Sequence, residues 1–127
     1  MNQPADQNRY RLIDSEPARF VECLPGMLIA SEDDALELIA YCGESDTQQL
    51  LVHAENLPAE FFDLHSRLAG NVLLKLSNYR IILAAVIPPE KIGTGRFSEM
   101  VLETNRGREF RVFNTRDDAV KWLSGLS

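Results

Sequence analysis

Hydrophobic and polar positions along this chain follow two different periods, and the periods predict strands and helices in turn. Two short extended runs, Tyr10–Ile13 and Arg19–Cys23, flank a proline-containing turn and predict an N-terminal hairpin. Nearly continuous apolar runs at 49–53 and 80–87 are typical of strands that are covered on both faces. The run at 109–113 alternates more, which predicts a strand nearer the edge of the sheet.

Helical spacing of apolar residues predicts four helices, placed between and after these strands. We expect the first helix to begin at Ser31, the second at Pro58 or Ser66, and the fourth at Thr115. The third should span about Arg96–Arg106. Ser31 can cap the first helix, with Asp34 at the capping-box position and Gly43 at its expected end. The spacing after Pro58 leaves open whether one helix forms there or a short turn followed by a helix near Ser66.

The order of these elements predicts the fold class. Strand, strand, helix and then alternating strands and helices favour a single α/β domain over residues 9–127. We expect a mixed sheet of about five strands, in which an antiparallel N-terminal hairpin precedes parallel βα units with right-handed crossovers and about four helices. Residues 1–8 look like a loose tail.

The composition excludes several classes of protein. The longest apolar run, Ile81–Ile87, is far too short to span a membrane, and the first residues lack the pattern of a signal peptide. Cys23 and Cys42 form no CxxC pair, which predicts a reduced, cytoplasmic protein with two packing thiols. The net charge of −6 argues against non-specific nucleic-acid binding.

The charge is nevertheless uneven along the chain. Residues 1–64 hold 3 Lys/Arg and 13 Asp/Glu, a balance of −10, whereas residues 65–127 hold 10 and 6, a balance of +4. Such a molecule could pair head to tail or offer a basic surface to an acidic partner. Acidic first turns of helices explain part of the same asymmetry.

Polar side chains gather after the predicted strand 49–53, where ligands of open parallel sheets bind. They are His53, Glu55, Asn56, Asp63, His65 and Ser66. We take His53, Glu55, Asn56, Asp63 and Ser66 as a candidate ligand or partner surface. A metal-dependent hydrolase using His53, Glu55, Asp63 and His65 is an alternative, although their spacing matches no established zinc motif.

A second candidate lies in the basic run at 105–111, where Arg106 and Arg108 could bind an anion or a partner. The chain has no nucleophile elbow, no dinucleotide-binding glycine motif and no P-loop. We therefore assign no catalytic residue, expect no cofactor or metal, and expect a protein that is not an enzyme. A purely structural homodimer is a further alternative.

Several motifs resemble one bacterial family, called domain of unknown function 4180. They are Glu55-Asn-Leu-Pro58, Glu60-Phe-Phe-Asp-Leu64, Leu68-Ala-Gly70, Leu76-Ser-Asn-Tyr-Arg80, Gly95-Arg-Phe97 with Glu99-Met100, and Asn105-Arg-Gly107 with Phe110-Arg-Val-Phe113. The resemblance covers nearly the whole chain after the tail and implies no established activity. The family commonly has Thr-Gly-Leu-Ala-Gly where this chain reads Ser66-Arg-Leu-Ala-Gly70.

More distantly, the strand, the Asp-containing loop and the Leu-Ala-Gly helix resemble the STAS domain of anti-sigma factor antagonists. That resemblance implies a regulatory module in which a hydroxyl residue at the helix start is phosphorylated, and the matching positions are Asp63 and Ser66. Phosphate would reverse the charge of a docking surface there. The leading interpretation is a STAS-like regulatory or binding module for a protein partner or small ligand, or a homodimer.

Overall fold

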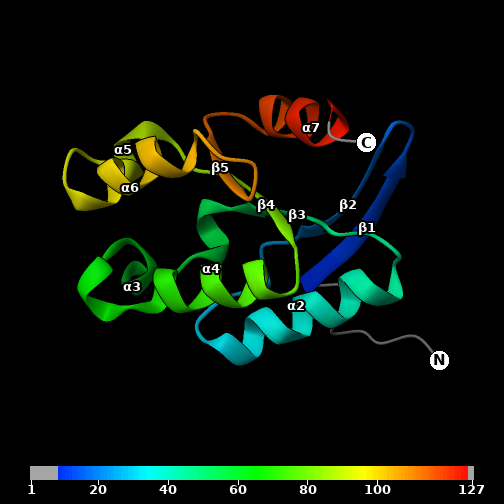
Figure 1. The fold of residues 1–127 in the computed structure, drawn as a ribbon, viewed down its shortest axis with the longest axis horizontal. Helices are drawn as coiled ribbons and strands as arrows, with labels where there is room; N and C mark the ends of the chain where they lie inside the picture. The colour runs from blue at the N-terminus through cyan, green and yellow to red at the C-terminus, as the bar shows by residue number, and fades with distance from the viewer. Residues whose placement is uncertain (1–8, 126–127) are drawn as a thin grey trace.

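A five-stranded sheet forms the centre of the fold in the computed structural model, which describes residues 9–125 (Figure 1). The strands are β1 Tyr10–Ser15, β2 Ala18–Cys23, β3 Gln49–His53, β4 Ile82–Val86 and β5 Phe110–Phe113. The helices are α2 Glu32–Glu44, α3 Ala59–Phe62, α4 Leu68–Asn78, α5 Pro89–Ile92, α6 Arg96–Thr104 and α7 Arg116–Gly125. Two 3₁₀ turns, η1 Ala54–Asn56 and η2 Leu64–Ser66, complete the segment between β3 and α4. The tail expected at 1–8 lies outside the described residues.

The order of strands in the sheet is the order of the chain, β1-β2-β3-β4-β5. β1 and β2 pair antiparallel, with Tyr10 opposite Cys23, and every later pair is parallel. β3 and β4 lie side by side, with His53 opposite Val86, and β5 is an edge strand. The predicted mixed sheet, with an antiparallel hairpin followed by parallel units, is confirmed.

Helices cover the two faces of the sheet unequally (Figure 1). Apolar residues of α2, α4 and α6 pack with the sheet in one large core, which includes Leu38, Val72 and Val101. Among the described helices, α7 packs on the opposite face. Its Leu123 belongs there to a smaller buried cluster that also contains Phe20 of β2 and Leu51 of β3. Both faces of the central strands are therefore buried, which explains their continuous apolar sequence.

The helix starts agree with the predicted caps, but the first helix ends later than expected. The Ser31 hydroxyl accepts a hydrogen bond from the Asp34 N–H. Helix α2 runs past Gly43, and the left-handed residue after it is Asp46, with φ 57°. The N–H of Thr47 bonds to the Cys42 carbonyl, so an aspartate closes the helix where glycine was expected to do so.

The segment between β3 and β4 contains separate pieces and not one long helix. The chain leaves α3, makes the turn η2, and enters α4 through Arg67, whose φ of 67° lies in the left-handed region. A residue with a side chain is strained in that conformation by about 1–2 kcal/mol, whereas glycine is not.

The short helix α5 was not anticipated, because Pro88 and Pro89 suggested only an end to the preceding strand.

Because chain order equals strand order, the charge asymmetry of the sequence becomes an asymmetry in space. The acidic first half builds β1, β2 and α2 at one side of the sheet, and the basic second half builds α6 and β5 at the other, whereas α7 crosses back over β2. Among residues 9–125, no helix combines the length and the apolar character that crossing a membrane requires.

Candidate functional site

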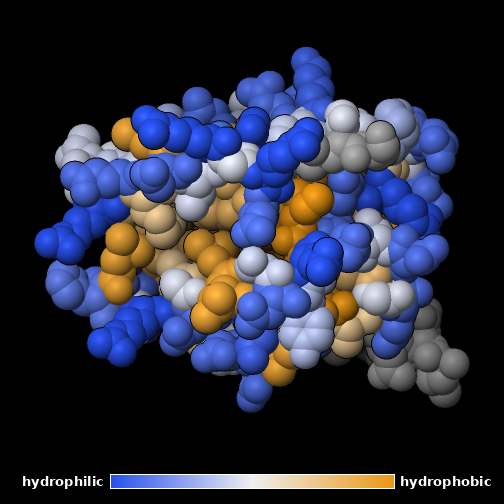
Figure 2. Space-filling model, in the orientation of Figure 1, coloured by the Kyte–Doolittle hydropathy of each residue, from blue (hydrophilic) through white to orange (hydrophobic). Residues whose placement is uncertain are grey.

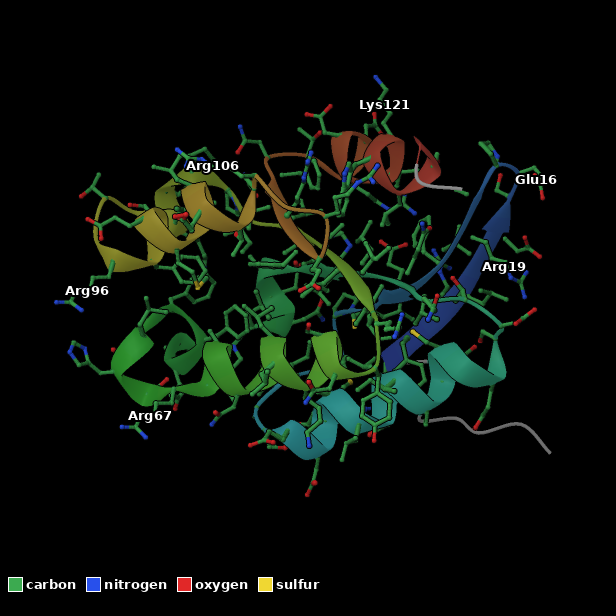
Figure 3. All side chains as sticks on the ribbon, in the orientation of Figure 1. Glu16, Arg19, Arg67, Arg96, Arg106 and Lys121 are labelled. Carbon is green, nitrogen blue, oxygen red and sulfur yellow. The ribbon has the colours of Figure 1, made fainter. Side chains whose placement is uncertain are left out.

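The loops that follow β2, β3, β4 and β5 meet at one edge of the sheet, because the carboxyl ends of parallel strands share an edge. We call the part built by residues 24–32 and 53–68 the edge surface. It contains the predicted residues His53, Glu55, Asn56, Asp63 and Ser66. In Figure 3, Arg67 and Arg96 extend from the end of the molecule at which α4 and α6 begin.

Asn56 fastens the two loops of the edge surface to each other. Its side chain is fully buried, and its amide nitrogen donates to the carbonyl oxygens of Leu24 at 2.7 Å and Met27 at 2.9 Å. Its Oδ1 accepts from the His53 N–H at 2.8 Å, and its own carbonyl accepts from the Ile29 N–H at 2.8 Å. Asn56 is therefore a structural bridge, and it offers no polar group to a ligand.

His53 belongs to an ionic cluster that the sequence did not suggest. Its Nε2 lies 2.7 Å from Oε2 of Glu22, a residue only 5% exposed near the end of β2. Arg116, at the start of α7, donates to both oxygens of the same carboxylate, at 2.9 and 2.8 Å. The Arg116 guanidinium also lies 6.0 Å from the centre of the Phe20 ring.

The electrostatics of this cluster favour the ionised carboxylate. Burial by itself raises the pKa of Glu22, but the hydrogen bonds from His53 and Arg116 outweigh it and lower the pKa from 4.5 to about 2. The hydrogen bond with Glu22 likewise raises the pKa of Arg116. The Glu22 carboxylate therefore stays ionised at neutral pH. Through charge-assisted hydrogen bonds to His53 and Arg116 it links β2 to β3 and α7.

Ser66 and Asp63 lie in the turn before α4. Ser66 is exposed, and its hydroxyl lies within hydrogen-bond distance of the Glu60 and Asp63 carbonyl oxygens while it accepts from the Leu68 N–H. Asp63 accepts from the His65 N–H, and its Oδ1 lies 3.5 Å from the exposed ring Nδ1 of the same histidine. The regulatory interpretation requires an exposed Ser66 at a helix start; Ser66 is exposed, but it ends the turn η2, and Arg67 is the N-cap of α4.

The residues of the hydrolase alternative do not converge. His53 contacts Glu22, whereas His65 pairs with Asp63 on the surface, and Glu55 is exposed. Within the described range 9–125, no three His, Cys, Asp or Glu side chains are grouped as a metal site requires.

Arg106 and Arg108 lie away from the edge surface. Both are exposed in the connection that precedes β5, so they belong to the amino-terminal edge of the sheet. His53 ends β3 at the carboxyl-terminal edge. The fold therefore separates the predicted site residues into two groups on opposite edges.

A hollow of about 410 Å³ lies within the edge surface, between the start of α2 and the turn before α4. Its lining residues are Ala30, Ser31, Glu32, Pro58, Glu60, Ser66, Leu68 and Asn71. The Glu32 carboxylate also pairs with Lys75 at 3.6 Å. The hollow is therefore a mixed polar and apolar depression on a surface that Asn56 holds together.

Two features of the sequence could have revealed the Glu22 cluster. Glu22 interrupts the otherwise apolar run Phe20–Cys23, and a buried carboxylate requires a cationic partner. Arg116 stands in the first turn of a helix, where the helix dipole disfavours a cation and a nearby carboxylate would compensate. The partners are 94 residues apart, so neither feature identifies the other.

A known protein family matches most of the chain. The model of a family described as "Domain of unknown function (DUF4180)" matches residues 19–123. Neither a curated protein nor a solved structure matches the chain.

Proposed function

The chain belongs to the family of domain of unknown function 4180, and we propose that it is a non-enzymatic, cytoplasmic binding module whose edge surface recognises a protein partner. The observation that carries this proposal is the bridge made by Asn56, which ties two loops from separate crossovers into one rigid unit. A surface that is ordered before binding loses less conformational freedom when a partner docks.

The shape and the polarity of the edge surface support a binding role. Its hollow is open, and polar groups of Ser31, Glu32 and Glu60 stand beside the apolar Pro58 and Leu68. Protein interfaces combine an apolar centre with a polar rim in this way. The edge surface also lies where parallel sheets of this kind hold their ligands.

The polar side chains of His53 and Asn56 already bond to other parts of the protein, which supports a binding role over a catalytic one. His53, which ends β3, is already bonded to Glu22, and the buried amide of Asn56 is fully engaged with backbone groups. A general base must reach a proton of its substrate within hydrogen-bond distance. Residues that hold loops in place are instead suited to presenting a fixed surface. Cys23 and Cys42 are free and buried, which supports a reducing compartment.

The STAS likeness of the sequence supports a regulatory version of the same proposal. In that version phosphate on Ser66 would add charge to the lining of the hollow and alter docking. The present hydroxyl contacts two backbone carbonyl oxygens, so modification would also loosen the turn before α4.

Site-specific photo-cross-linking in cells that naturally make the protein tests the proposal. A photoreactive residue is introduced at Glu60, which is exposed in the lining of the hollow, and as a matched control at Lys121, which is exposed on α7 (Figure 3). We expect a discrete protein adduct from position 60 and none from position 121. Adducts of the same proteins at both positions, or at position 121 alone, would refute the edge surface as the docking site.

A further inference from the structure

A second hollow, of about 430 Å³, lies between α4 and α6, away from the edge surface. Its apolar lining comes from Leu73, Leu76, Ile81, Leu83 and Phe110. Figure 2 shows hydrophobic residues gathered in a depression near the middle of the face, between the positions of α6 and α4 in Figure 1. Its size falls within the range of small-molecule sites, roughly 300–1,000 Å³. We call it the α4–α6 groove.

The α4–α6 groove continues into a more polar hollow of about 340 Å³ at the amino-terminal edge of the sheet. Ser77, Ile81, Arg108 and Glu109 line both hollows, so the two form one continuous depression. Gln48, Arg80 and Ile82 complete the polar hollow. The depression therefore has an apolar part and a polar part that contains two guanidinium groups and the carboxylate of Glu109.

Those two guanidinium groups are free to bind a ligand. Within residues 9–125, neither Arg80 nor Arg108 has a side-chain hydrogen bond or an ion pair. The carboxylate of Glu109 accepts a hydrogen bond from the Ser77 hydroxyl, and Glu103 lines only the apolar hollow. Among the described residues, an anionic group placed in the polar hollow would thus meet two unpaired cations and one carboxylate, that of Glu109, which the Ser77 hydroxyl already engages.

The backbone of Arg80 gives a second indication. Its φ of 61° places it in the left-handed region, directly after the end of α4, where glycine is the favoured residue. The N–H of Ile81 bonds to the Leu76 carbonyl and fixes this turn. An arginine held in a strained position beside a hollow is consistent with a role for its side chain there.

We propose that the α4–α6 groove binds a small amphiphilic anion. Its hydrocarbon body lies on Leu73, Leu83 and Phe110, and its carboxylate or similar head group contacts Arg80 and Arg108. This ligand is distinct from the protein partner of the edge surface, because the groove opens at the amino-terminal edge of the sheet.

Titration with decanoate, below its micelle concentration, tests the proposal when it is followed by amide shifts of isotope-labelled full-length protein. We expect saturable shifts at Ser77, Gly107 and Phe110, which belong to the lining. Decan-1-ol, which has the same chain without the charge, should bind about tenfold more weakly, because charge-assisted hydrogen bonds are lost. Equal affinity for decanoate and decan-1-ol, or shifts confined to other regions, would overturn the proposal.

Matched variants separate the two parts of the site. The double variant Arg80→Ala/Arg108→Ala should weaken decanoate binding about tenfold and leave decan-1-ol binding unchanged. Arg106→Ala removes an exposed arginine outside both hollows and should change neither.

Two tryptophan variants test the apolar part. Leu73→Trp fills the α4–α6 groove and should abolish binding of both probes. Leu74→Trp alters the next residue, which is 61% exposed and not part of the lining, and should leave binding intact. Unchanged decanoate affinity in Leu73→Trp, or in the double arginine variant, which alters only exposed side chains, would contradict the assignment.

Discussion

Substitution of Glu22 by glutamine is the sharpest test of the ionic cluster. The carboxylate is buried against His53 and Arg116, and its pKa falls from 4.5 to about 2. Each pKa unit corresponds to about 1.36 kcal/mol, so the ionised group stabilises the folded state by about 3 kcal/mol at neutral pH. We expect Glu22→Gln to lower the free energy of unfolding at pH 7 by about that amount.

The pH dependence of this loss follows from the direction of the shift. The pKa of Glu22 is lower in the folded state than in the unfolded chain, so its contribution is fully present above pH 4.5. The contribution is lost as the pH falls toward 2. The stability difference between wild type and Glu22→Gln should therefore narrow by about 2 kcal/mol between pH 7 and pH 3.

Urea unfolding at a series of pH values, followed by circular dichroism, measures these differences. The matched control is Asp14→Asn, which breaks an ion pair with Arg19 on the surface. Exposed pairs contribute about 0–1 kcal/mol, so that variant should unfold much as the wild type does. The reasoning on Glu22 is refuted if its variant loses less than about 1 kcal/mol at pH 7, or if the loss does not depend on pH.

Three further outcomes follow from the same structure. Asn56→Ala should lower the free energy of unfolding by about 2–4 kcal/mol in urea titrations, because buried backbone groups lose their partners; a loss within error would disprove its bridging role. Arg67→Gly and Arg80→Gly should each raise the free energy of unfolding by about 1 kcal/mol, because glycine adopts the left-handed backbone at these positions without strain. Thermal unfolding measures this, and a lower melting temperature in either variant would contradict the reasoning. Cys23 and Cys42 should resist thiol reagents at pH 8 until denaturant is added, because burial raises the pKa of Cys42 to about 12 and that of Cys23 further; rapid labelling of the native protein would count against it.

The fold could be predicted from the sequence because each element carries its own local signal. The uninterrupted apolar run ending at Ile87 indicated a strand covered on both faces, and Ser31 and Thr115 marked helix starts by capping. The helix ends were harder to predict. Asp46 closes α2 in place of Gly43, because aspartate also tolerates left-handed backbone when the following N–H groups bond to the helix carbonyls.

The site could be predicted only in part, because contacts between distant segments leave little trace in local sequence. The rule for parallel sheets correctly directed attention to the residues after β3, yet it could not reveal that Asn56 is buried in backbone contacts. Glu22 and Arg116 were missed as a pair, since their association depends on α7 folding back across β2. Arg108 was a second candidate for binding, and the strand direction places it at the opposite edge of the sheet from His53.

The central claim is that Asn56 makes the edge surface rigid before any partner binds, and amide hydrogen exchange of the free protein measures this most directly. The N–H groups of Ile29 and His53 both bond to Asn56. We predict that both amides exchange as slowly as those of the central strands, and that Asn56→Ala accelerates both together. Fast exchange at Ile29 and His53 in the wild-type protein would contradict the claim.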